Sequence, residues 1–259
     1  MVLTDDMDPV VTALADQQTE LTDILGGLDD ADWRRPSRCE GWTVADVVLH
    51  LAQTNEMAIA SVDERLPDYL ADVGRQLGDA PQSNVDDGAA LMVAKERDRP
   101  LEDLKARWQR SVDDFLGRLD DVDFHRRVMW VAGELSTRTL VTTRLAETWI
   151  HTGDVADSVG VEQQATDRLQ HIARLAWRTL PYAFERAGRT LTGPVAFELR
   201  GPTGAAWKFL PDQSALTTIR GDGVQLCLVA ARRVDPGSTS LTGDGPDAHT
   251  VLELVRTYA

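Results

Sequence analysis

The sequence predicts an α+β protein of two domains, with a helical bundle over residues 1–187 and a small α+β domain over residues 188–259 whose sheet is mostly antiparallel. Three observations support this prediction. Long segments with apolar residues at helical spacing fill the first part of the chain. From about residue 188 the segments become short and β-prone, and Gly, Pro and Asp separate them. The length of 259 residues is sufficient to bury a substantial core.

The first two helices have clear start signals. Residues 8–28 carry one apolar stripe, with Asp8 in position to cap the helix and Pro9 at the first helical position. A loop containing Pro and Gly follows. Thr43 then opens a helix of about five turns, and Asp46 at its third position forms an acidic variant of the capping box.

Apolar periodicity and turn residues also predict the elements in the rest of the chain. Residues 67–88 contain several Gly and Pro residues and are expected to form an irregular excursion with some helix. Amphipathic patterns predict further helices over residues 100–119, 137–159 and 163–187. The segments "GPVAFELRG", "AAWKFLP", "ALTTIRG" and "VQLCLVAARR" are predicted to be strands, and "GPDAHTVLELVRTYA" is predicted to form a final helix.

Charge and cysteine content narrow the classes of partner. The chain has 42 acidic and 27 basic residues, and the resulting net charge of −15 disfavours binding to nucleic acid or to an anionic membrane surface. The two cysteines are far apart and form no CxxC motif, so no disulfide framework is expected. An acidic N-terminus and the lack of a long apolar run predict a cytoplasmic protein. The oligomeric state is not readable from the sequence.

Two predicted helices carry candidate metal ligands. His50 lies in the middle of the second helix, and Glu147 and His151 lie one turn apart on the helix over 137–159. Two imidazoles and one carboxylate leave an open coordination position, as in catalytic zinc sites. Zn²⁺ suits this set, and Fe²⁺, Ni²⁺ and Mn²⁺ also fit it. The alternative is a hydrogen-bonded core histidine and a separate surface pair.

Both segments also resemble a known family. "CEGWTVADVVLHLA" (39–52) and "RLAETWIHTGDVADSVG" (144–160) resemble the paired signature of the mycothiol-dependent maleylpyruvate isomerase family, which belongs to the DinB-like metal-binding bundles. The resemblance implies a DinB-like four-helix bundle followed by a C-terminal α+β domain. It also implies a divalent metal, usually zinc, held by His50, Glu147 and His151, with mycothiol as the thiol cofactor.

Three further residues are predicted to act at the site. Asp154 matches an aspartate of the family signature and is expected to accept the N–H of His151. Arg144 either holds a carboxylate of the substrate or cofactor or pairs with Glu147. Arg220, in the second domain, is a candidate for binding an anionic part of the cofactor.

The remaining cysteine, tryptophan and histidine candidates are given structural roles. Cys39 is expected to be a small buried residue of the loop before the second helix, and Trp42 is expected to pack at the entry of that helix. His125, His171 and His249 are expected to be exposed or locally hydrogen-bonded.

The predicted function is a metal-dependent, mycothiol-using isomerase or S-transferase acting on a small electrophilic substrate, which can be anionic. Metal binding keeps a thiol deprotonated near neutral pH, which makes this chemistry reasonable. Two alternatives keep the metal: a hydrolase that uses metal-activated water, and a non-catalytic protein that binds or senses a metal or thiol. In a third alternative, the histidines are structural and never meet.

Overall fold

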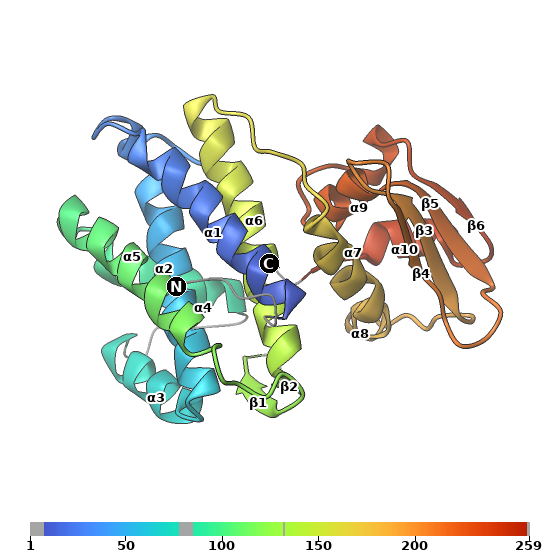
Figure 1. The fold of residues 1–259 in the computed structure, drawn as a ribbon, viewed down its shortest axis with the longest axis horizontal. Coiled ribbons are helices and arrows are strands. Elements are labelled where there is room, and N and C mark those ends of the chain that lie inside the picture. The colour runs from blue at the N-terminus through green and yellow to red at the C-terminus, as the bar shows by residue number, and fades with distance from the viewer. Residues whose placement is uncertain (1–7, 78–84, 132, 258–259) are drawn as a thin grey trace. The chain divides into compact units, whose positions relative to one another are not determined.

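The structure is a computed structural model that describes residues 8–77, 85–131 and 133–257 (Figure 1). It contains two compact units, Met1–Gln163 and Gln164–Ala259. This division precedes the domain boundary expected at residue 187, because α7 (Leu169–Arg178) and α8 (Leu180–Arg186) pack within the second unit. There α7 contacts α9 and β4, and α8 contacts α10. We therefore describe the two units separately.

The first unit is built around a bundle of long helices. These helices are α1 (Pro9–Gly26), α2 (Val44–Val62), α5 (Leu101–Gly117) and α6 (Thr137–Val159). Helix α1 packs against α6, and α2 packs against both α5 and α6 (Figure 1). Their apolar stripes meet in a core of fully buried side chains that includes Leu14, Leu51, Phe115 and Leu145. The predicted helical bundle is confirmed.

Side-chain caps fix the ends of these helices. The side chain of Asp8 accepts a hydrogen bond from the Val10 backbone N–H at 3.1 Å. Thr43 and Asp46 form both hydrogen bonds of the predicted capping box at the start of α2. Gly160 ends α6 with a left-handed backbone at φ 74°, a conformation that costs glycine little. These caps set where α2 and α6 begin and end, and hence where their polar residues lie.

Three features of the first unit were not fully predicted. The segment predicted to be irregular with some helix contains α3 (Leu66–Leu77) and α4 (Val85–Glu96), and residues 78–84 lie outside the described residues. Pro67 is the second residue of α3, where a missing N–H costs no intrahelical hydrogen bond. The antiparallel hairpin of β1 (Arg127–Trp130) and β2 (Gly133–Ser136) was not predicted. A 3₁₀ turn, Asp32–Arg34, precedes α2.

The second unit contains a small mixed sheet. Its strands are β3 (Val195–Arg200), β4 (Ala206–Phe209), β5 (Thr217–Asp222) and β6 (Thr242–Asp244), in the order β4-β3-β5-β6. The β3–β4 and β5–β6 pairings are antiparallel, and the β3–β5 pairing is parallel. The predicted α+β class with a mostly antiparallel sheet is confirmed.

Two predictions for the second unit are wrong in detail. The helix expected over 163–187 is divided into α7 and α8, because Pro181 in the first turn of α8 has no N–H for a continuous helix. The segment "VQLCLVAARR" is helix α9 (Gly223–Ala230) instead of a strand. Asp222 begins this helix by accepting the Gln225 backbone N–H at 2.9 Å, a capping signal that the apolar run obscured.

The chain ends with the 3₁₀ turn Pro236–Ser238, strand β6 and helix α10 (Ala248–Leu254). The predicted final helix is thus present over part of its expected length. Among the helices of the described residues, none is long and apolar enough to cross a bilayer.

Candidate metal centre

The three predicted metal ligands come together between α2 and α6. His50 Nε2 lies 3.4 Å from Glu147 Oε2, and His151 Nε2 lies 3.7 Å from the same oxygen. One ligand atom from each residue lies within 4.8 Å of the others. The imidazole rings of the two histidines meet edge to face, with their centroids 5.2 Å apart. The alternative in which these residues never meet is therefore wrong.

The spacing of these atoms fits the coordination of a small divalent ion. Zn–N bonds of about 2.0–2.1 Å and Zn–O bonds of about 2.0–2.2 Å at a tetrahedral angle place ligand atoms about 3.3–3.5 Å apart. The observed separations of 3.4 and 3.7 Å are close to this range. Because the protein supplies three donors, the set also corresponds to a site with one open position.

Burial and mutual contacts set the protonation states at the centre. Burial would raise the pKa of Glu147, but the hydrogen bond with His50 and the nearby charges of His151, His50 and Arg144 lower it to about 2. Burial lowers the pKa of His50, although its hydrogen bond with Glu147 opposes this shift. The metal-free centre therefore presents an ionised carboxylate beside a neutral imidazole at neutral pH.

His151 is held differently. Burial would lower its pKa, but its hydrogen bond with Asp154, and then its contact with Cys39, raise the pKa to about 9. His151 Nδ1 lies 2.9 Å from Asp154 Oδ2, which is the contact predicted for Asp154. Because His151 is protonated at neutral pH without a metal, an ion that binds at Nε2 has to displace the proton on that nitrogen.

Arg144 lies deep in the bundle, one turn before Glu147. Its side chain is 1% exposed, and its Nε donates a hydrogen bond to Asn55 Oδ1 at 3.3 Å. Burial lowers the pKa of Arg144 to about 10, and the charge of Glu147 opposes this shift. The observed hydrogen-bond partner is therefore an amide, and Arg144 acts on Glu147 through its charge. The binding of a substrate or cofactor carboxylate by Arg144 stays a prediction.

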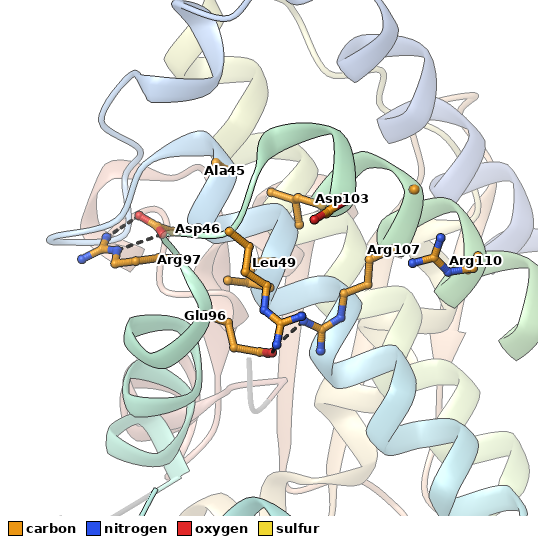
Figure 2. Close-up of a pocket in the computed structure, with 11 residues that line it drawn as sticks. Ala45, Asp46, Leu49, Glu96, Arg97, Asp103, Arg107 and Arg110 are labelled. Carbon is orange, nitrogen blue, oxygen red and sulfur yellow. Dashed lines mark hydrogen bonds and ion pairs between the residues drawn. The ribbon is translucent and has the colours of Figure 1, made fainter. Parts of the chain in front are cut away.

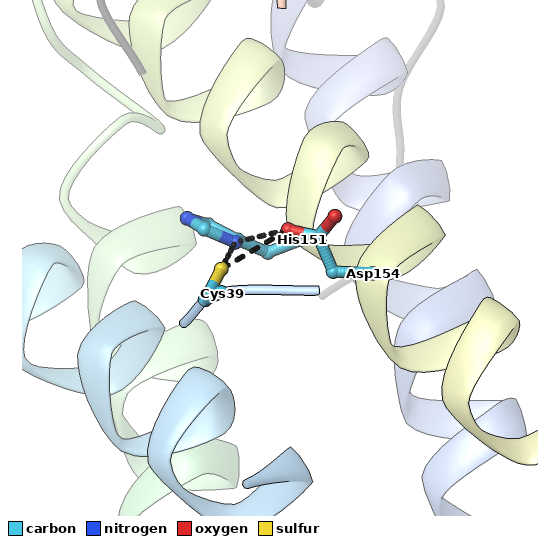
Figure 3. Close-up of side chains that lie close together, drawn as sticks. All are labelled: Cys39, His151 and Asp154. Carbon is cyan, nitrogen blue, oxygen red and sulfur yellow. Dashed lines mark hydrogen bonds and ion pairs between the residues drawn. The ribbon is translucent and has the colours of Figure 1, made fainter. Parts of the chain in front are cut away.

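Sequence reasoning missed the role of the loop before α2. Cys39 was expected to be a packing residue, yet its Sγ lies 3.4 Å from Asp154 Oδ2 and 3.8 Å from His151 Nδ1 (Figure 3). Trp42 packs at the helix entry as expected, and its ring also lies against His50 with centroids 5.2 Å apart. Residue spacing along the chain carries no signal for these contacts, because the loop, and not a helix, determines them.

Arg220 belongs to the second unit, and His125 belongs to the first unit. Arg220 is on β5 of the second unit, where its Nε donates a hydrogen bond to Glu198 Oε2 at 2.8 Å. Its predicted role in cofactor binding stays a prediction. His125 is exposed in the loop before β1, as expected.

A separate cavity of about 190 Å³ lies in the first unit (Figure 2). One of its lining residues is Asp46 of α2, one helical turn before His50. Ion pairs between helices line it. Arg97 binds Asp46, and Arg107 binds Glu96 at 2.8 Å. Arg107 also forms two hydrogen bonds of 2.7 Å with Glu56. These contacts join α2 to α5 and to the end of α4, so they stabilise the position of the helix that carries His50.

Comparison with known proteins supports the relationship that the two motifs indicated. The family profile of the mycothiol maleylpyruvate isomerase N-terminal domain matches residues 14–156. This protein belongs to that family. The matched range contains all three candidate ligands and Asp154, and it ends within α6. The family takes its name from an enzyme.

Similar proteins extend the comparison to the whole chain. Uncharacterized proteins from two strains of Mycobacterium tuberculosis are 30% identical over 255 residues, covering 98% of this chain and 96% of theirs. The crystal structure of a mycothiol-dependent maleylpyruvate isomerase is similar with a TM-score of 0.61 and 17% identity, covering 94% of this chain and 95% of that one. A histidine-to-alanine variant of such an isomerase gives a TM-score of 0.60 with 18% identity, at the same coverage. At these identities the structures establish a shared fold.

Proposed function

We propose that this protein is a metal-dependent enzyme that uses mycothiol as cofactor to isomerise a small electrophilic substrate, or to transfer the thiol to it. The observation that carries the proposal is the set of His50, Glu147 and His151, whose three donor atoms lie within 4.8 Å of one another. Three protein ligands are typical of a catalytic zinc site with one open position. Family membership supports the proposal, because the family is named after an isomerase that uses mycothiol. The ion that best suits the donors is Zn²⁺.

When bound, the ion and cofactor would supply a thiolate nucleophile near neutral pH, and reversible addition of a thiolate to an activated cis double bond permits rotation about that bond. Asp154 accepts the Nδ1–H of His151, which leaves Nε2 directed toward Glu147. Trp42 supports the ring of His50. The buried charge of Arg144 favours the ionised form of Glu147.

The nucleophile would come with the cofactor, so neither cysteine of the chain has to act as one. Cys227 is buried in the second unit, and burial raises the pKa of its thiol well above the ordinary value. Both cysteines are free thiols in the structure, in keeping with the cytoplasmic location that we propose.

The test combines metal analysis with turnover. Purified protein should contain about one equivalent of zinc per chain, since each chain has one such donor set. His50→Ala and Glu147→Gln should lose the zinc bound at this donor set and, with it, mycothiol-dependent turnover of maleylpyruvate or related electrophiles. His125→Ala is the matched control, because His125 is exposed outside the centre, and it should retain both.

Other outcomes would favour the alternatives. Turnover of esters or amides that needs the metal but no thiol would indicate a hydrolase. Tight binding of mycothiol without turnover of any electrophile would indicate a binding or sensing protein. Full activity of the metal-free wild-type protein would refute the proposal.

A further inference from the structure

His151 has polar partners on both nitrogens of its ring. Nε2 faces Glu147 at 3.7 Å, as the candidate centre requires. Nδ1 faces Asp154 Oδ2 at 2.9 Å and Cys39 Sγ at 3.8 Å, and these last two atoms are 3.4 Å apart (Figure 3). In a catalytic triad, the nucleophile and the carboxylate contact different nitrogens of the histidine. Here Cys39 and Asp154 both contact Nδ1 of His151, so the cluster does not have the geometry of a triad.

We propose that Cys39, His151 through Nδ1, and Asp154 form a second metal position that takes a thiophilic divalent cation such as Zn²⁺ or Cd²⁺. The spacing supports this assignment. Tetrahedral coordination with a Zn–S bond of about 2.3 Å and Zn–N and Zn–O bonds of about 2.0–2.2 Å separates S from N or O by about 3.5–3.6 Å, and N from O by about 3.3 Å. The observed separations are 3.8, 3.4 and 2.9 Å, so small side-chain movements suffice.

Charge and exposure also suit a cation at this position. A Cys39 thiolate and the Asp154 carboxylate together neutralise a divalent ion, whereas Glu147 alone neutralises half of that charge at the first position. Thiolate is also the preferred ligand of soft cations. Asp154 and His151 are buried, and Cys39 is partly exposed at the outer side of the cluster, which leaves a route for the ion.

The two positions exclude each other. Binding at Nδ1 releases the Nδ1 proton and the Cys39 thiol proton to solvent, while Nε2 keeps a proton that faces Glu147. Binding at Nε2 needs the opposite arrangement, with the Nδ1–H donated to Asp154. Occupation of both positions would require an imidazolate. Each chain should therefore hold one ion, and an ion beside Cys39 leaves the proposed catalytic position empty.

Titration with Cd²⁺ alone tests the inference, with stoichiometry and the near-ultraviolet thiolate-to-cadmium charge-transfer band as readouts. The assignment shares His151 with the proposed function, so the variants must separate the two positions. His50→Ala should keep one equivalent of Cd²⁺ with the charge-transfer band. Adding Cys39→Ser should weaken that binding by about tenfold or more, or about 1.4 kcal/mol, and abolish the band. Cys227→Ala, which removes the other thiol, should leave the band unchanged.

The outcomes for the two positions are distinct. Equal Cd²⁺ affinity of His50→Ala and the double variant, or binding by His50→Ala without the band, overturns the second position. Loss of all metal by Cys39→Ser with retention by His50→Ala instead overturns the first position and the proposed function. Glu147→Gln repeats the His50→Ala experiment by removing a different ligand, and near-ultraviolet circular dichroism confirms that each variant is folded.

Discussion

Replacement of Asp46 by asparagine tests how α2, the helix that carries His50, is held in place. The Asp46 side chain is 4% exposed. Its Oδ2 accepts hydrogen bonds from the Thr43 backbone N–H at 2.8 Å and the Thr43 hydroxyl at 2.9 Å. Its Oδ1 accepts one from Arg97 Nε at 3.1 Å. Asparagine has the same shape but only one accepting oxygen, so its NH₂ group would face one of these donors.

The expected loss of stability in Asp46→Asn has two parts, the helix cap and the ion pair with Arg97. Loss of a helix cap costs about 0.5–2 kcal/mol, and loss of a hydrogen bond to a charged group costs about 1.5–3 kcal/mol. The Arg97 side chain is 38% exposed, so water replaces part of its lost interaction. We therefore expect Asp46→Asn to lower the free energy of unfolding by about 2–3 kcal/mol, and Tm by about 4–12 °C for a unit of this size.

The pH dependence of this stability difference tests whether the ionised carboxylate of Asp46 is its cause. Burial would raise the pKa of Asp46, but its hydrogen bonds with Arg97 and Thr43 lower it below the ordinary value of 3.8. A lowered folded-state pKa means that the stabilisation is fully present above the unfolded pKa and is lost as the pH falls through the folded pKa. The difference between wild type and Asp46→Asn should be constant between about pH 8 and pH 5 and should shrink below about pH 4.

Thermal and urea unfolding followed by tryptophan fluorescence would measure these differences. Asp120→Asn is the matched control, because Asp120 is exposed, and it should change the stability by less than about 0.5 kcal/mol. A similarly small effect of Asp46→Asn, or an effect that persists unchanged in acid, would refute the reasoning.

Three further predictions concern the second unit, the cysteines and the metal. Gly245→Ala should destabilise the protein by more than about 2 kcal/mol in urea unfolding, because Gly245 has φ +106° and a Cβ there would lie 2.1 Å from the Leu216 carbonyl oxygen; a neutral effect would contradict this. Iodoacetamide should label Cys39 in the folded protein and Cys227 only after unfolding, since Cys227 is 0% exposed; mass spectrometry of peptides distinguishes the two. Zinc at about 100 times its Kd should stabilise the wild type by about 2.7 kcal/mol in a thermal-shift assay. An equal shift in the double variant His50→Ala, Cys39→Ser would argue against both metal positions.

The sequence predicted the bundle and the positions of its candidate metal ligands because local signals agreed with the tertiary structure. Capping residues such as Thr43 fixed the start of α2, and the helical spacing of Glu147 and His151 placed both on one face of α6. The meeting of His50 with this pair required a contact between residues 97 positions apart. Helical periodicity does not encode that distance, so the residues alone left open whether the three side chains meet, and the family resemblance favoured the metal site.

Other features depend on information that short segments do not contain. The run of α9 is apolar apart from Gln225, and such a run does not distinguish a buried helix from a buried strand. The position of Cys39 depends on how the loop closes, with the Trp42 N–H bonded to the Cys39 carbonyl at 3.0 Å. The strands of β1 and β2 have four residues each, too few for a clear alternating pattern.

The separation of 97 residues between His50 and Glu147 has a mechanical consequence. An ion bound by both would act as a reversible cross-link between α2 and α6, closing a loop that contains α3, α4, α5 and the β1–β2 hairpin. For a covalent cross-link around about 100 residues, the loss of chain entropy in the unfolded state corresponds to about 4.7 kcal/mol. Metal binding at this centre would thus strengthen the helix pairing that creates it, and removal of the ion would loosen the ligands and the bundle together.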